Sequence, residues 1–382
     1  MKPSLINFYY KYAAISLIAL FAATQFILII RHKSVFISDS YFYKHIYYQI
    51  KGDTYNEARQ KIVSQVDLKN SDEITTNIFI NQAAYSNSLT FFVKRPLYPL
   101  LVALISTLSK NEVFNFMFPV FLAYVGIVFL IYNLSGINLG RLFAAITSSL
   151  FIAFYPLLDW STYALTDTIG AFFWILQVFL AYLYISGSKT KWLLAYAVVL
   201  ALSLTNREQS TLMIPLFIIL FILTKFAKLP GKLKPKIINL IVISVIFSLA
   251  YMMIMIILGQ RSILETIAYT HNNFGLTSNR YSTAELIKFS VDSFKTSHLV
   301  FFHELIQHHW WFIISVISIM GIAKTLVTKG KSLIDLLLLS SGIASYMFVF
   351  IFPSLQYRYF FPVLFTIIYF AAKFIKEYFE TV

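Results

Sequence analysis

The sequence contains no cysteine and unusually few charged residues. The absence of cysteine from all 382 residues excludes thiol catalysis, disulfide bonds and cysteine-ligated metal sites. Charged residues make up only 13% of the chain, against roughly 25% in ordinary soluble proteins. Acids are the scarcer kind, with 17 Asp and Glu against 31 Lys and Arg. This composition excludes an ordinary soluble globular protein.

Apolar residues take the place of the missing charge. They make up 58% of the chain, and the mean hydropathy is +0.71. Apolar stretches near the roughly 20 residues that cross a bilayer recur along the whole length. The first follows Lys2 and Lys11 and is longer than a signal-peptide core, so it is predicted to be a retained helix. Because the composition does not change along the chain, residues 1–382 are predicted to form one all-α transmembrane domain.

About ten transmembrane helices are predicted. The piece at 97–108 is too short to span comfortably and suits an interfacial or re-entrant helix, with an eleventh span as the alternative. The predicted spans are residues 10–30, 115–134, 142–158, 168–186, 192–205, 211–226, 237–258, 310–326, 333–352 and 360–376.

Positive charge orients these spans. With the N-terminus inside, lysines gather in the inner segments, as at 225–236 and 324–331, whereas the short outer turns carry only Arg207 and Arg358. Cytoplasmic loops are enriched in Lys and Arg, so this asymmetry predicts a cytoplasmic N-terminus. It also explains the net charge of +14 without nucleic acid, for which no binding motif is present.

Two long segments are then predicted to lie outside the membrane, at 31–114 and 259–309. The first is rich in tyrosine, including Tyr41 and Tyr43, and such rings suit helices at the level of the lipid headgroups. The second ends in the aromatic stretch His298–Trp311, which is predicted to be another surface-lying helix.

Arginine is distributed differently from lysine. Of eight arginines, only Arg141 falls inside in this topology, and the other seven face outward. The planar guanidinium group suits bidentate phosphate binding, which favours an outer anion site. Interaction of single arginines with outer headgroups or with local acids is the alternative. The outer arginines are Arg31, Arg59, Arg95, Arg207, Arg261, Arg280 and Arg358, of which Arg95, Arg207, Arg280 and Arg358 are the candidates for the anion site.

A few acids fall near the predicted outer helix ends. Asp39 could deprotonate or orient a hydroxyl, or hold a divalent cation, and its alternative role is a helix N-cap. Asp159 and Asp167 bracket an outer turn, where a carboxylate is costly unless it is used, although Asp167 also suits an N-cap. Glu208 could simply pair with its neighbour Arg207, and Asp335 suits a cap at an inner helix start.

Four short motifs occur in order along the predicted outer segments. They are Ser38-Asp39-Ser40 with Tyr43, Lys94-Arg95-Pro96-Leu97-Tyr98-Pro99, Thr166-Asp167-Thr168 and Arg358-Tyr359-Phe360-Phe361-Pro362. This order resembles the GT-C superfamily of membrane glycosyltransferases, and within it the protein O-mannosyltransferase and aminoarabinose-transferase branch. The likeness covers most of the chain as a layout, although each motif is short.

The resemblance implies a fold and a chemistry. It implies that the first outer loop forms juxtamembrane helices and that the donor is a polyprenyl-phosphate sugar. It also implies that Asp39 acts as the base and that Lys94 or Arg95, with Arg358, holds the donor phosphate. Relatives carry two adjacent acids in the first loop, whereas Asp39 stands between serines, so the need for a divalent cation is left open.

The sequence therefore predicts a membrane glycosyltransferase of the cell envelope, with its active site on the extracytoplasmic face, as in a bacterial inner membrane. The acceptor would be a glycan, lipid or protein. A transporter or flippase of lipid-linked sugars and a sugar-chain polymerase are the alternatives; the former would favour mid-membrane charges and paired repeats. The candidate catalytic residues are Asp39 and Asp167, and the candidate substrate-binding residues are Tyr43, Lys94, Arg95, Asp159, Arg207, Glu208, Arg280 and Arg358.

Overall fold

The computed structural model describes residues 3–260, 263–272, 279–307, 309–328, 331–351 and 357–380, and within them it contains helices and no strands. The α-helices are α1 Pro3–His32, α2 Ser38–Ile50, α3 Tyr55–Gln65, α4 Glu73–Ile80, α5 Gln82–Val93, α6 Leu97–Ile105, α7 Glu112–Ala153, α8 Tyr155–Ser161, α9 Asp167–Gly187, α10 Thr190–Asn206, α11 Met213–Phe226, α12 Lys234–Ile257, α13 Ile263–His271, α14 Thr283–Gln307, α15 His309–Val327, α16 Leu333–Tyr346, α17 Phe348–Ile351 and α18 Phe361–Phe379. Three 3₁₀ turns join them, η1 Glu208–Leu212, η2 Gly231–Leu233 and η3 Tyr357–Tyr359.

Several of these helices can cross a membrane. Within the described residues, six helices are long and apolar enough to do so, or seven if α5 and α6 count as one broken span. Two further apolar helices, α10 and α16, are shorter. The predicted all-α polytopic membrane fold is confirmed, while the number ten stays a prediction.

Helix α7 contains two antiparallel arms. A straight helix of 42 residues would be about 63 Å long, twice the roughly 30 Å of the hydrocarbon core. Gly140 interrupts it with φ 77° and ψ 178°. A Cβ placed on Gly136 would lie 3.8 Å from the Cβ of Ala144, a contact that residues eight apart make only when the chain turns back. The two arms correspond to the spans predicted at 115–134 and 142–158.

Replacing Gly140 should destabilise the fold. Its backbone lies in a region of φ and ψ that is essentially restricted to glycine, so Gly140→Ala should lower the free energy of unfolding by about 1–3 kcal/mol. Thermal unfolding in detergent would measure this loss. Gly187→Ala is the matched control, because a Cβ there meets nothing within 4 Å at an ordinary φ. Equal stability of both variants would contradict the assigned turn.

The piece predicted as an interfacial or re-entrant helix is the second half of a bent pair. Helices α5 and α6 meet at 85°, with Lys94, Arg95 and Pro96 between them. Proline disfavours helical geometry in the residue before it, which accounts for the break at this point. Helices α5 and α6 therefore do not form one straight membrane span. The side chains of Lys94 and Arg95 lie at the bend between them.

The first long loop folds into helices, as the resemblance implied. Phe42 on α2 stacks on Phe79 at 5.4 Å and on Phe92 at 4.7 Å between ring centroids. Aromatic pairs of this kind join α2 to α4 and α5 in one apolar core. In the second loop, the helix predicted over His298–Trp311 falls on the end of α14, which extends to Gln307, and on the start of α15 at His309; residue 308 lies outside the described residues.

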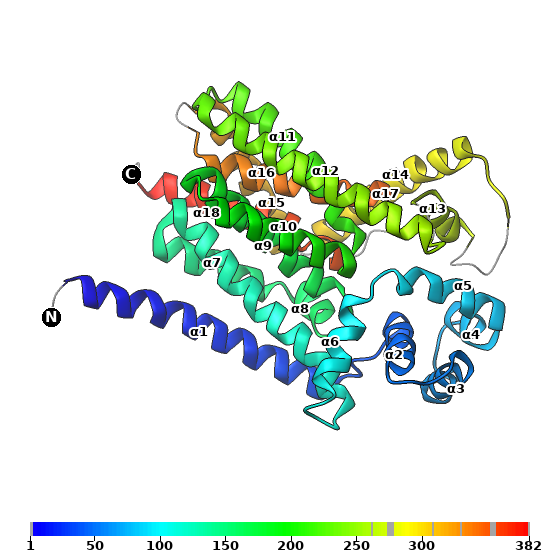
Figure 1. The fold of residues 1–382 in the computed structure, drawn as a ribbon. Coiled ribbons are helices and arrows are strands. Elements are labelled where there is room, and N and C mark those ends of the chain that lie inside the picture. The colour runs from blue at the N-terminus through cyan, green and yellow to red at the C-terminus, as the bar shows by residue number, and fades with distance from the viewer. Residues whose placement is uncertain are drawn as a thin grey trace.

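The two ends of the bundle differ in character. The start of α1 and the end of α18 lie at one end, and helices α2–α5 and α13 gather at the other (Figure 1). The lysine-rich turn between α11 and α12 lies at the end with the termini (Figure 1). The bundle thus separates a basic end from a loop end.

Asp335 corrects one sequence interpretation. It lies inside α16 after the N-cap residue Ser332, and only 2% of it is exposed. Its carboxylate accepts hydrogen bonds from Tyr369 Oη at 2.7 Å, Lys373 Nζ at 2.7 Å and Asn138 Nδ2 at 3.0 Å. Asp335 therefore links α16 to α7 and α18 rather than capping a helix. Its buried negative charge is compensated by Lys373 inside the bundle.

Candidate active site

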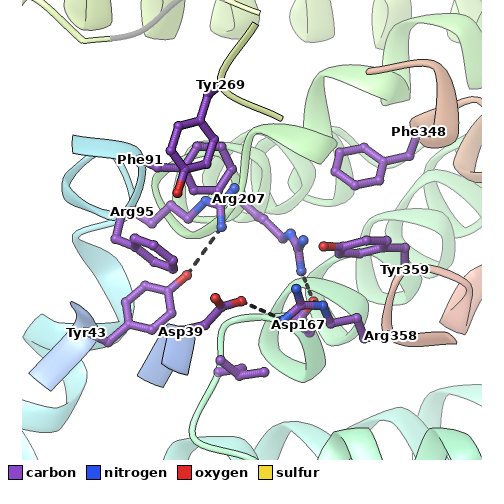
Figure 2. A pocket seen from close by; sticks show the side chains of 12 residues that line it. Asp39, Tyr43, Phe91, Arg95, Asp167, Arg207, Tyr269, Phe348, Arg358 and Tyr359 are labelled. Carbon is purple, nitrogen blue, oxygen red and sulfur yellow. Dashed lines mark hydrogen bonds and ion pairs between the residues drawn. The ribbon is translucent and has the colours of Figure 1, made fainter. Parts of the chain in front are cut away.

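A pocket opens at the loop end of the bundle, and Figure 2 shows the side chains that line it. It brings together residues from the first long loop, the start of α9, the residue after α10, helices α13 and α17, and the segment before α18. Six candidates from the sequence are among its lining residues, which are Asp39, Tyr43, Phe91, Phe92, Arg95, Leu165, Asp167, Arg207, Tyr269, Phe348, Arg358 and Tyr359.

Asp39 faces an arginine from the other end of the chain. Its Oδ2 accepts a hydrogen bond from Arg358 Nη1 at 2.8 Å, across 319 residues of sequence. The N-cap of α2 is Ile37, whose N–H donates to Ser40 Oγ at 3.2 Å, so the N-cap alternative for Asp39 is wrong. The side chain of Asp39 remains 32% exposed, and an incoming molecule can reach it.

Asp167 is the buried acid of the pocket. It is the first residue of α9, behind the N-cap residue Thr166, so its N-cap alternative is also wrong. Its Oδ1 accepts a hydrogen bond from Arg207 Nη1 and lies 3.8 Å from Arg358 Nε. Asp167 therefore sits between two guanidinium groups and fixes both of them.

Arg207 and Glu208 do not pair with each other. Arg207 has an extended backbone with φ −162° and ψ 127°, and successive side chains of extended backbone point in opposite directions. Arg207 reaches Asp167, whereas Glu208 accepts two hydrogen bonds from Arg95, at 3.0 and 3.1 Å, and an ion pair from Lys94 at 2.8 Å. The pairing of neighbours that the sequence left open is wrong.

Removal of the Glu208 charge should destabilise the folded protein. The side chains of Lys94 and Arg95 are only 6% and 5% exposed, and breaking such a buried pair costs about 3–5 kcal/mol. Glu208→Gln should therefore lower the thermal unfolding temperature in detergent markedly. Glu380→Gln breaks a pair in which Glu380 is 63% exposed and should cost about 0–1 kcal/mol. Similar unfolding temperatures for the two variants would contradict this role.

Tyr43 connects the two halves of the pocket. Its hydroxyl lies 2.9 Å from Thr166 Oγ1 and 3.4 Å from Arg95 Nη1. Burial raises the pKa of the Tyr43 hydroxyl, although Arg95 acts in the opposite direction. Tyr43 therefore stays protonated at neutral pH and orients its neighbours by hydrogen bonding.

Aromatic rings hold the arginines in place, and these rings were not among the sequence candidates. The Tyr359 ring lies close to both Arg207 and Arg358, whose guanidinium carbons are 5.0 and 5.1 Å from its centroid (Figure 2). The guanidinium carbon of Arg95 lies 4.4 Å from the Phe91 centroid. Tyr359 follows Arg358 directly in one of the motifs, so adjacency was the signal that could have found it.

The pocket favours an anion. Three guanidinium groups line it against two carboxylates, those of Asp39 and Asp167. The Nε atoms of Arg207 and Arg358 are buried and find no hydrogen-bond partner among the described residues. Buried donors without acceptors are costly, and a phosphate group supplies both the charge and the oxygens that arginine binds best.

Other sequence candidates lie elsewhere. Asp159 on α8 pairs with Lys33 at 2.7 Å and does not line the pocket. Arg280 is exposed and is not among the lining residues either. Lys94 and Glu208 do not line the pocket, but Glu208 forms ion pairs with Lys94 and with the lining residue Arg95. Arg261 lies outside the described residues.

The described residues do not suit a divalent cation at this site. No group of three or more His, Asp or Glu gathers there to ligate a metal, within the ranges that the structure describes. Both lining carboxylates are engaged by arginines, whose positive charge opposes a second cation.

The fold and the pocket together define a polytopic membrane protein that presents arginines and carboxylates at one end of its bundle. Residues 93–270 match the model of the dolichyl-phosphate-mannose-protein mannosyltransferase family, and no curated protein matches the chain significantly. The matched region includes Arg95, Asp167 and Arg207 but neither Asp39 nor Arg358. The match confirms the resemblance to the GT-C superfamily of membrane glycosyltransferases, of which this family is a part.

Proposed function

We propose that this protein transfers a sugar from a polyprenyl-phosphate carrier to a hydroxyl group of an acceptor, at the pocket containing Asp39, Asp167 and Arg358. The observation that carries the proposal is the convergence of arginines from three distant segments on one cavity with a partly exposed carboxylate. A glycan, a lipid or a protein could supply the acceptor hydroxyl.

The arginines serve the leaving group. In the reaction, the acceptor oxygen forms a bond to the anomeric carbon while the bond from that carbon to the phosphate oxygen breaks. Polyprenyl phosphate leaves with the bonding electrons, and its negative charge grows in the transition state. Arg207 and Arg358, held by Asp167 and stacked on Tyr359, are positioned to stabilise that charge.

Asp39 accepts the proton of the attacking hydroxyl in this mechanism. It is the more exposed of the two carboxylates, at 32% against 5% for the Asp167 side chain. Its partner Arg358 turns to the donor phosphate when the carrier binds, which frees the carboxylate for the acceptor. Asp167, which is fully engaged by arginines, acts as a positioning residue.

The active site belongs on the extracytoplasmic face in this proposal. The end of the bundle opposite the pocket carries the lysine-rich turn between α11 and α12 (Figure 1). Lysine and arginine collect on the cytoplasmic side of membrane proteins, so the pocket would open on the other side. There the prenyl tail can stay in hydrocarbon while the phosphate reaches the arginines.

The direct test is incubation of the purified protein with polyprenyl-phosphate sugars and membrane extract, followed by mass analysis of the products. We expect an acceptor to gain one sugar while free polyprenyl phosphate appears in equal amount. Movement of the intact carrier across a liposome membrane without any transfer would instead support a flippase. The position of the charged groups at helix ends rather than in mid-membrane favours the transferase.

A further inference from the structure

A second pocket lies between the arms of α7 and the end of α9. It shares no lining residue with the candidate active site and plays no part in the proposed reaction. Its lining residues are Tyr132, Asn133, Gly136, Ile137, Arg141, Phe179, Tyr182 and Leu183.

This pocket lies at the basic end of the bundle. Lys236 Nζ donates a hydrogen bond to the carbonyl of Ile185, close to the α9 wall of the pocket, at 2.6 Å. Lys376 Nζ donates to the carbonyl of Asn138, beside the α7 wall, at 3.1 Å. Two lysines therefore lie beside the pocket, and acidic headgroups concentrate around basic segments at a membrane surface.

The walls combine hydrogen-bonding and apolar groups. Tyr132 is only 3% exposed, and its hydroxyl has no hydrogen-bond partner among the described residues. Arg141, the only arginine of the predicted inner segments, lines the same pocket. Close by, Leu142 is 69% exposed and Phe129 is 40% exposed, as expected for a surface that faces hydrocarbon.

The geometry points to a binding site for an anionic phospholipid, whose phosphate lies beside Arg141 and accepts a hydrogen bond from Tyr132. The acyl chains extend over the exposed apolar surface of α7. Guanidinium and phosphate groups match in charge and geometry, and basic pockets between transmembrane helices bind acidic headgroups in this way. Because apolar side chains share the walls with Arg141 and exposed apolar residues of α7 lie beside the pocket, the ligand is a membrane phospholipid rather than a free anion.

Native mass spectrometry of the full-length protein, released from nanodiscs of mixed phosphatidylglycerol and phosphatidylcholine, tests this site. We expect one phosphatidylglycerol to be retained in preference to phosphatidylcholine. Arg141→Gln should weaken that retention about fivefold, the effect of one basic residue at a membrane surface. Tyr132→Phe removes only the hydroxyl and should also weaken the retention of phosphatidylglycerol. This variant tests the site if Arg141→Gln does not fold.

Lys191→Gln is the matched control, since it removes one cation from the inner segments without touching the pocket. It should leave the retained lipid unchanged. If Lys191→Gln and Arg141→Gln lost the same amount of retained phosphatidylglycerol, general attraction to a basic surface would explain the binding, and the proposal would be overturned. Wild-type retention in both pocket variants, or full displacement of the lipid by millimolar inorganic phosphate, would overturn it too.

Discussion

Replacement of Asp39 by asparagine should lower the rate of sugar transfer about 10²–10⁴-fold, the usual contribution of a general base. Asparagine keeps the size of the side chain and can still contact Arg358, but it cannot accept the proton of the attacking hydroxyl. Single-turnover transfer from a polyprenyl-phosphate sugar, followed by mass spectrometry, measures this loss. Donor binding should remain, because the three arginines of the pocket are unchanged.

Asp159→Asn is the matched control for this experiment. Asp159 also lies near the loop end, but it pairs with Lys33 and does not line the pocket. Its variant should transfer sugar at close to the wild-type rate. Near-normal turnover in Asp39→Asn, with the protein folded and inserted in the membrane, would remove Asp39 from the role of base.

Replacement of Arg358 by alanine should lower the transfer rate about 10²–10³-fold, as when one donor to a developing negative charge is lost. Arg358 contacts both carboxylates, at 2.8 Å to Asp39 and 3.8 Å to Asp167. The variant therefore also removes a positive charge that balances these two acids. Arg358→Lys keeps the charge but loses the planar fork and should recover only part of the rate. Steady-state kinetics with varied donor concentration separate the effects on binding and on turnover.

Arg280→Ala provides the control for the arginine variants. Arg280 is exposed and outside the pocket, so its loss should change neither the rate nor the donor affinity. If Arg280→Ala impaired transfer as strongly as Arg358→Ala, the anion site would have to include the segment that precedes α14. Unchanged kinetics in Arg358→Ala would exclude Arg358 from the site.

The positions of the site residues were largely readable from the sequence. In a chain with 13% charged residues, a charge at the end of an apolar run is conspicuous because burial of an unpaired ion is costly. This reasoning selected Asp39, Asp167, Arg207 and Arg358, which all line the pocket. It also selected Asp159 and Arg280, because a charge near the membrane surface can be satisfied by water or by a local partner as well as by a site.

The partners were not readable in the same way. The sequence offered a pair of neighbours, Arg207 and Glu208, but an extended backbone at Arg207 sends the two side chains in opposite directions. The N-cap roles of Asp39 and Asp167 were equally plausible locally, but Ile37 and Thr166 take the N-cap positions and the two acids contact arginines from other segments. Such choices depend on atoms that come close only after the helices have packed.

The sequence by itself determined that this protein is a helical membrane protein, and roughly where its helices run, because apolar length and charge act locally along the chain. The break of α7 at Gly140 and the bend before α6 also followed from residues at those points. Only the tertiary structure decided which charges meet, since the pairing of Asp39 with Arg358 joins positions 319 residues apart. Helix packing sets that distance, and no local pattern records it.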